Sequence, residues 1–223
     1  LTTRLAYLTT GAPDTDAISR AGLDALAVTV NRRTAAELGT TVAVDPAVDE
    51  LAFYPLLYWP VDAGTLNPSP LAIQRLIEYM RSGGTILFDF RHGAEARPPT
   101  FQALARRLEI PPLVPLPADH VLRRAYYLLA DLPGRRTGDA VWVVDRAEQI
   151  NDGVTPVIAG SHDWAGAWAA DDAMRPMFAV VPGGEQQREL AFRFGVNLVM
   201  HVLTGNYKAD QVHLPAIMER LGQ

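Results

Sequence analysis

The stretch Thr85-Ile-Leu-Phe-Asp-Phe-Arg-His-Gly93 decides the fold, because an apolar run of strand length ends abruptly in polar and charged residues. Such a run indicates a buried β-strand. In open α/β sheets, ligands bind in the crevice beyond the carboxyl ends of the strands. Asp89, Arg91 and His92 are therefore the first candidates for a functional site.

A helix with readable ends is predicted directly before this strand. Ser69 can cap it, Pro70 suits its first position, and Gly83-Gly84 can end it. The succession of helix, glycine turn and buried strand indicates an α/β unit. We therefore predict an α/β fold with three layers, in which helices cover both faces of a mostly parallel central sheet.

Similar patterns extend along the chain in both directions. Strands are expected at Leu5–Thr9, Leu51–Trp59, Val141–Val144 and Val157–Ala159, and helices at Thr15–Thr34, Thr100–Leu108 and Gln186–Leu203. Pro55 predicts a bulge or two short pieces in the second strand. Four prolines in the range 111–117 exclude a regular helix or a central strand and predict a surface crossing or a linker. Loops are expected at Ser161–Trp168 and at Gly205–His213.

The composition is that of one globular domain. The chain has 223 residues, of which 48% are hydrophobic, so we expect residues 1–223 to form a single domain. The net charge is −5 and the arginines are scattered, so nucleic-acid binding is not expected. No apolar run approaches the roughly 20 residues that span a bilayer. The absence of cysteine excludes thiolate catalysis, disulfides and cysteine metal sites.

Several stretches carry a resemblance to a known family. They are Phe53-Tyr-Pro-Leu-Leu-Tyr-Trp-Pro60, Gly83-Gly-Thr-Ile-Leu-Phe-Asp89, Asp119-His-Val-Leu122, Ala125-Tyr-Tyr-Leu-Leu129, Asp163-Trp-Ala-Gly-Ala-Trp168 and Leu203-Thr-Gly-Asn-Tyr-Lys-Ala-Asp-Gln-Val-His213. Over nearly its whole length the chain resembles the uncharacterised bacterial family known as domain of unknown function 4159. The resemblance implies a flavodoxin-like α/β domain similar to the class I glutamine amidotransferases, and it implies no known reaction.

The resemblance also implies a setting in the cell. Domains of this kind are often joined to membrane-spanning segments in large bacterial envelope proteins. The chain begins at Leu1 and enters a strand pattern almost at once, as a piece excised from a longer polypeptide would. We therefore expect the soluble domain of a membrane-anchored envelope protein, on the periplasmic side, with membrane contact only through segments outside this chain.

Amidotransfer by the usual chemistry is excluded. Glutamine amidotransferases use a cysteine nucleophile on a sharp turn after a strand, and this chain has no cysteine. By the resemblance, Asp89 occupies the related position at the end of its strand. The domain is then either a binding module or a different catalyst.

The candidate ligand pocket consists of polar residues between apolar segments, together with one tryptophan: Asp89, Arg91, His92, His120, Asp163 and Trp164. Two carboxylates and two imidazoles could hold a divalent metal ion, and His92 could instead act as a general base. The structural alternatives are that Asp89 caps a turn or pairs with Arg91, and that His120 bonds to the backbone. Trp164 and Trp168 could wall the pocket, but packing in the core is the commoner role of tryptophan.

Three further patterns have two interpretations each. Gly183-Gly184 could hold an anion at the start of the longest helix, but Glu185 can already fill that place. Arg135-Arg136 could grip a phosphate or lie as solvated surface. Arg193 and Asn197 share a helix face, where a buried pair that ties the helix to the sheet is favoured over a site contact.

The expected loop after the longest helix would display an interaction surface or form a structural clasp, with Tyr207, Lys208, Asp210 and His213 exposed. Two functions remain open for the chain. The favoured one is a non-catalytic module that binds a small ligand or a protein partner. The alternative is a cysteine-independent hydrolase, with or without the assistance of a metal ion, that acts at the strand end around Asp89.

Overall fold

A computed structural model of the chain describes residues 2–61, 67–91, 99–145 and 154–221, with side chains described as far as residue 205. The strands are β1 (Ala6–Leu8), β2 (Val42–Val44), β3 (Leu56–Val61), β4 (Thr85–Phe90), β5 (Leu113–Pro115), β6 (Trp142–Val144) and β7 (Val157–Gly160). The helices are α1 (Pro13–Arg33), α2 (Pro70–Arg81), α3 (Pro99–Arg107), α4 (Trp164–Trp168) and α5 (Gly184–Leu221), and Leu51–Phe53 and Val121–Arg123 form short 3-10 helices, η1 and η2.

The described strands form one mixed sheet in the order β2-β1-β3-β4-β7-β6-β5. The first five strands of this order are parallel, while β6 runs antiparallel to β7 and β5 antiparallel to β6. Counted along the chain, the five parallel strands follow the order 2-1-3-4-5 of flavodoxin-like sheets. The prediction of a mostly parallel sheet is confirmed.

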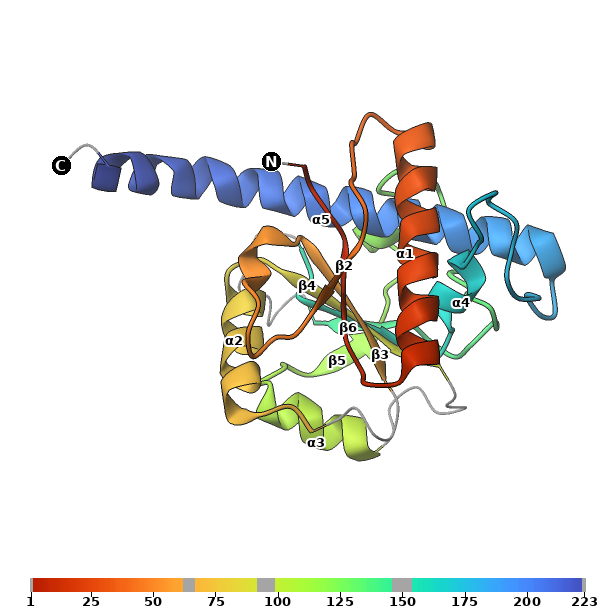
Figure 1. The fold of residues 1–223 in the computed structure, drawn as a ribbon, viewed down its shortest axis with the longest axis horizontal. Helices are drawn as coiled ribbons and strands as arrows, with labels where there is room; N and C mark the ends of the chain where they lie inside the picture. The colour runs from red at the N-terminus through yellow and green to blue at the C-terminus, as the bar shows by residue number, and fades with distance from the viewer. Residues whose placement is uncertain (1, 62–66, 92–98, 146–153, 222–223) are drawn as a thin grey trace.

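Helices cover both faces of this sheet (Figure 1). On one face, α1, α4 and α5 pack through Leu26, Trp168 and Phe194 on sheet residues such as Leu87. On the other face, α2 and α3 bury a separate apolar cluster. Successive side chains of a strand point to opposite faces, so Asp89 shares the face of Leu87 and points toward the α4 side. This periodicity sets the direction of the first candidate residue.

Two predicted elements have the expected bounds for the expected reasons. β4 spans Thr85–Phe90, and all six residues are buried. α2 begins at Pro70, and the Ser69 hydroxyl accepts a hydrogen bond from Ala72 N. The predicted strand Leu51–Trp59 is divided at Pro55: the 3-10 helix η1 precedes the proline and the strand β3 follows it.

Two predicted loops are wrong. Residues 164–168 of the expected loop form the short helix α4, because the Asp163 side chain caps it. α5 does not end near Gly205 but continues to Leu221. A Cβ at Gly205 would lie 2.1 Å from a methyl carbon of Val154, so this glycine permits close packing instead of ending the helix. Figure 1 shows the C-terminal part of α5 projecting beyond the sheet.

Two short strands, β5 and β2, were not expected from the sequence. β5 lies within the proline-rich segment, and it is the last strand of the sheet order, where proline is tolerated. β2 was not predicted, since three residues are too short a run to be distinguished by periodicity.

Candidate functional site

Asp89 is fully buried near the carboxyl end of β4, where β3 and β7 pair with it on either side. Its carboxylate accepts three hydrogen bonds. The Tyr58 hydroxyl donates to Oδ2 over 2.7 Å, Asp163 N donates to Oδ1 over 2.9 Å, and Trp164 N donates to Oδ2 over 2.7 Å. Asp89 therefore binds the start of α4 to the centre of the sheet.

Asp163 stands between β7 and α4 in a left-handed backbone conformation, with φ 51° and ψ 56°. Few residues other than glycine adopt this conformation, and aspartate is among those that tolerate it best. Its side chain accepts hydrogen bonds from Gly166 N, from Arg91 Nε over 2.8 Å and from Arg135 Nη1 over 3.4 Å. A Cβ at position 166 would lie 2.4 Å from Asp163 Oδ2, so the cap requires a glycine there.

The two carboxylates and the two guanidinium groups form one largely buried network, which we call the Asp89–Asp163 network. Burial and, after it, the charge of Asp163 raise the pKa of Asp89 to about 7, against the opposing effects of the Tyr58 hydroxyl, Trp164 N and Arg91. Two cations balance two potential anions, as the burial of charge requires. The donors that contact the Asp89 carboxylate are thus a buried hydroxyl and two backbone N–H groups of the protein itself.

His162 lies beside this network with its ring stacked on Trp164, at 4.4 Å between ring centroids and 6° between planes. Glycines surround the imidazole closely: a Cβ at Gly138 or Gly160 would lie 2.5 Å from one of its ring atoms. Burial lowers the pKa of His162 to about 4. The ring is therefore neutral near pH 7, and its Nδ1 has no hydrogen-bond partner among the described residues.

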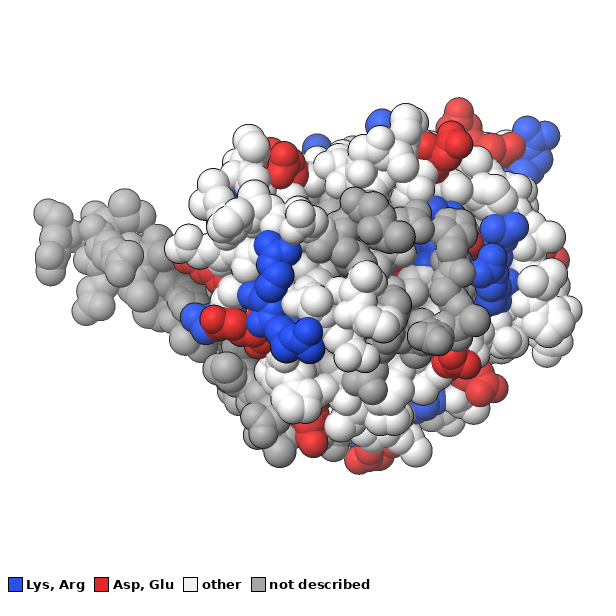
Figure 2. Space-filling view, turned by 90° about the horizontal axis from the view of Figure 1, so that it is seen from below, with Lys and Arg blue, Asp and Glu red and all other residues white. Residues whose placement is uncertain are grey.

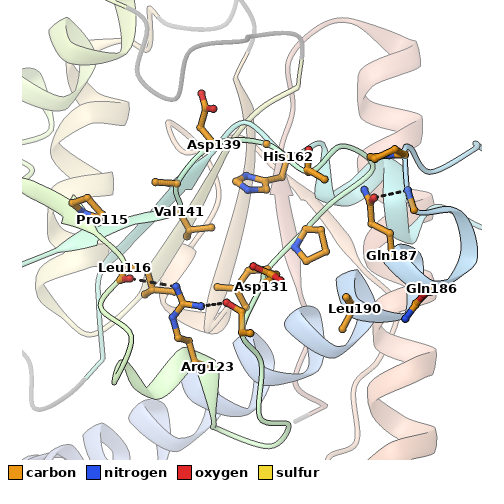
Figure 3. A pocket seen from close by; sticks show the side chains of 18 residues that line it. Pro115, Leu116, Arg123, Asp131, Asp139, Val141, His162, Gln186, Gln187 and Leu190 are labelled. Atoms are coloured by element: carbon orange, nitrogen blue, oxygen red, sulfur yellow. Dashed lines mark hydrogen bonds between the residues drawn. The ribbon is translucent and has the colours of Figure 1, made fainter.

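An open cavity of about 680 Å³ borders His162 at the edge of the sheet where β7 ends and β6 begins (Figure 3). This volume is in the range of small-molecule sites. The wall comes from the segments around β5 and η2, from residues 130–141 and from the start of α5. The residues that line it are Pro115, Leu116, Arg123, Ala130, Asp131, Leu132, Pro133, Thr137, Gly138, Asp139, Ala140, Val141, His162, Pro182, Gly183, Gln186, Gln187 and Leu190.

The structure brings together four of the six predicted pocket residues. Asp89 bonds to the backbone of Asp163 and Trp164, Arg91 bonds to Asp163, and each of the four residues is at most 5% exposed. They form a packed cluster and do not line the cavity. His92 lies outside the described residues.

The fifth described candidate, His120, has a structural contact of its own. Its Nδ1 accepts a hydrogen bond from Leu122 N and so caps η2, and its ring lies 6.1 Å from that of His201 on α5. Within the described part of the chain, no group of three His, Cys, Asp or Glu residues is placed to hold a metal ion. The backbone bonding considered for His120 from the sequence is confirmed.

Both tryptophans of α4 are core residues. Trp164 and Trp168 are fully buried, and their indole N–H groups donate to Leu132 O and Ala191 O. Packing, which the sequence favoured, is their role in the fold.

Asn197 is fully buried on α5, but it ties the helix to residues 122–127 and not to the sheet. Its amide oxygen accepts from Tyr126 N and Tyr127 N, and its amide nitrogen donates to Leu122 O and Tyr127 O. Arg193 is partly exposed and pairs with Glu189, so the prediction of a buried pair holds for Asn197 alone.

The segment predicted to display Tyr207, Lys208, Asp210 and His213 is helical in its backbone, as part of α5. The prediction of a loop there is wrong, and the side chains lie outside the described ones. At the start of the same helix, Glu185 pairs with Arg188.

Sequence reasoning missed Tyr58 and gave His162 no role. Tyr58 lies 31 residues from Asp89 and meets it only because β3 and β4 pair. The glycines at positions 138 and 160 leave room for the His162 ring, but no local sequence pattern shows that both of them lie against the same imidazole. Arg135 was considered as a phosphate ligand and instead pairs with Asp163.

One face of the molecule shows how the charges of the described residues are distributed. Seen from the side on which α1 begins, acidic and basic residues alternate over the face and do not form a single patch of one sign (Figure 2).

Comparison with known proteins identifies the family but no activity. None of the described helices is both long enough and apolar enough to cross a membrane. No curated protein matches the chain. One family model matches residues 4–203, and the chain thus belongs to the family described as Domain of unknown function (DUF4159).

Proposed function

We propose that this domain is a non-catalytic binding module that holds a small ligand in the cavity beside His162. The observation that carries the proposal is the separation of two features. The Asp89–Asp163 network is largely buried and its groups bond to one another, while the open cavity of about 680 Å³ lies next to it. A ligand in that space would meet walls held in place by the cluster.

Rigid support of this kind is what a binding site needs. His162 follows β7, and its backbone carbonyl accepts a hydrogen bond from Arg136 N. The Gln187 side chain joins the start of α5 to the same wall, because its amide nitrogen donates to Gly134 O and its amide oxygen accepts from Gly183 N. Walls fixed before the ligand arrives lower the entropy cost of binding.

The alternative is a hydrolase that uses Asp89. A pKa of about 7 would suit a general acid or base. Such a group must reach the proton that it transfers, and the Asp89 carboxylate is 0% exposed with Tyr58, Asp163 and Trp164 bonded to it. A binding role is the better account of this geometry.

The proposal is tested with a library of small molecules, screened by ligand-observed NMR against the wild-type domain and against Ala140→Trp. Ala140 is exposed and lines the cavity, so the indole should fill the mouth of the cavity without disturbing the core. We expect compounds that bind the wild type and not the variant. If every compound that binds the wild type also binds Ala140→Trp equally well, the cavity is not the site.

Catalysis is tested in parallel with p-nitrophenyl acetate and p-nitrophenyl phosphate, with and without Zn²⁺ or Mn²⁺. We expect no turnover above the buffer rate. Turnover that is lost in Asp89→Asn, and also in the milder variant Tyr58→Phe, would overturn the non-catalytic assignment in favour of the hydrolase.

A further inference from the structure

We infer that the cavity beside His162 selects a ligand with an apolar body and a positively charged amine. This inference rests on the proposed function and adds the chemical class of the ligand. It follows from which polar groups of the lining are free to make contacts and which are already occupied.

The cationic side chain of the lining is bonded to the protein itself. Among the described residues that line the cavity, Arg123 and His162 are the ones that could carry positive charge. The Arg123 guanidinium donates to three backbone carbonyls, those of Pro117, Ala130 and Leu116 (Figure 3 shows the last two). His162 is neutral near pH 7 because burial lowers its pKa. Three of the five N–H groups of Arg123 are thus occupied, and its charge offsets one of the two carboxylates in the lining, so an excess of negative charge remains.

The negative charge of the lining is available. Asp131 and Asp139 are both exposed, and within the described part of the chain neither has an ion-pair partner. Figure 3 shows Asp131 near the middle of the lining and Asp139 at its rim. An ionised carboxylate accepts hydrogen bonds and donates none, so these groups suit an ammonium.

The N-terminus of α5 favours an anion and so opposes the two carboxylates, but its effect is weaker. A helix N-terminus is equivalent to roughly half a positive charge, whereas Asp131 and Asp139 carry full charges. The first turn also contains the carboxylate of Glu185, and the Gly183 and Gly184 N–H groups are occupied by Gln187 Oε1 and Val180 O. The carboxylates therefore dominate.

The remaining wall is apolar. Leu132, Val141 and Leu190 line the cavity together with three prolines. Such a wall favours a hydrocarbon body, because apolar surface that it removes from water stabilises the complex. The combination of apolar wall and free carboxylates defines an amphiphilic amine.

Three probes of almost the same shape separate charge from shape: benzylamine, benzyl alcohol and benzoate. Their affinities are measured by NMR titration at pH 7 and low ionic strength, with the wild type, Asp131→Asn, Ala140→Trp and the control Asp14→Asn. The substitution Asp14→Asn removes the same charge from an exposed position that does not line the cavity. One close ion pair near a surface is worth about a fivefold to tenfold change in affinity.

We expect benzylamine to bind about tenfold more tightly than benzyl alcohol, and benzoate to bind most weakly. Asp131→Asn should lower the affinity for benzylamine about fivefold and leave benzyl alcohol unchanged, whereas Asp14→Asn should alter neither. If benzyl alcohol or benzoate binds as tightly as benzylamine, and Ala140→Trp abolishes that binding, the cavity binds ligands but the charge inference is wrong. If Ala140→Trp changes the binding of none of the three probes, the proposed function itself fails.

Discussion

Asp89 Oδ2 lies 2.7 Å from Trp164 N, so one carboxylate of β4 fixes the first turn of a helix 75 residues further along the chain. The same oxygen accepts from the Tyr58 hydroxyl, and the other carboxylate oxygen accepts from Asp163 N. The contact explains why a charged residue lies in an otherwise apolar strand. It gives Asp89 a structural role that can be measured directly.

Asp89→Ala should destabilise the domain strongly. The substitution leaves the Tyr58 hydroxyl and two backbone N–H groups buried without an acceptor, and each costs about 1 to 3 kcal/mol. We expect the free energy of unfolding, measured in urea, to fall by about 3 kcal/mol or more. Asp14→Ala, at an exposed position in the first turn of α1, should change it by less than about 1 kcal/mol, because it removes only an interaction with the helix N-terminus. A loss below about 1 kcal/mol for Asp89→Ala would show that the network contributes little to stability.

The raised pKa of Asp89 gives stability a pH dependence with a defined sign. The pKa in the folded state is about 7, above the ordinary value of 3.8, because burial and Asp163 favour the neutral form. The stabilising contribution is thus complete below about pH 4 and is lost as the pH rises through about 7. We expect the stability advantage of the wild type over Asp89→Asn to be larger at pH 5 than at pH 7.5 by about 2 kcal/mol.

Urea titrations of both proteins at the two pH values measure this difference. All the histidines are common to the two proteins, so their titrations largely cancel. A difference that does not change with pH, or that grows toward alkaline pH, would contradict the assigned direction.

The buried histidines should give stability a pH dependence of the opposite sign. Burial lowers the pKa values of His162 and His201 to about 4, from an ordinary value of 6.5. Their contributions are complete above about pH 6.5 and are lost as the pH falls through about 4. In an NMR titration from pH 7.5 to 5, we expect the Cε1–H signals of both rings to stay at their neutral positions. A midpoint near 6.5 for His162 would mean that its ring is solvated, and this would also weaken the account of the cavity.

Gly22→Ala should destabilise the domain although alanine is the better helix former. A Cβ at position 22 on α1 would lie 2.4 Å from Ala165 O and 2.8 Å from Ala165 Cα, which are backbone atoms of α4. The helices would have to separate, so we expect a loss of about 1 to 3 kcal/mol against a propensity gain of up to about 1 kcal/mol. The exposed control Ala17→Ser on the same helix should lose less than about 0.5 kcal/mol. A gain in melting temperature for Gly22→Ala would contradict the close contact of α1 and α4.

Asn197→Leu should detach residues 122–127 from α5. The substitution leaves two backbone N–H groups without their acceptor and two backbone carbonyls without their donor. We expect the free energy of unfolding to fall by about 2 to 4 kcal/mol. Thr204→Ala on the same helix should change it by less than about 0.5 kcal/mol, since the Thr204 hydroxyl bonds only within the helix and is exposed. Equal stabilities for the two variants would show that the Asn197 contacts are not retained in solution.

Local patterns predicted the central elements well. β4 and α2 have strong signals, which are a continuous apolar run in one case and a capped amphipathic stretch in the other. α4 was missed because five residues are too few for a helical period, and its cap depends on the left-handed residue Asp163. Gly205 was misread because a glycine that permits close packing and a glycine that ends a helix look alike in a sequence.

The site was predictable only in part, for a related reason. The polar end of β4 predicted Asp89 and Arg91 as pocket residues, and the structure places both in a buried cluster of ionisable groups that does not line the cavity. Asp163, 74 residues from Asp89, was named with it as a pocket candidate, but no local pattern showed that it would donate its N–H to Asp89 or that Tyr58 would complete the cluster. The cavity is formed by several separate segments beyond β4, so it had no sequence signal at all.

The central claim is that ligands bind in the cavity beside His162 and not at the Asp89–Asp163 network. The most direct test records the backbone amide signals of the ¹⁵N-labelled domain while benzylamine is added. The account predicts shifts concentrated at residues 137–141, 162 and 183–187, with the signals of residues 89–91 unchanged. Shifts concentrated at residues 89–91, with the cavity signals unchanged, would contradict it.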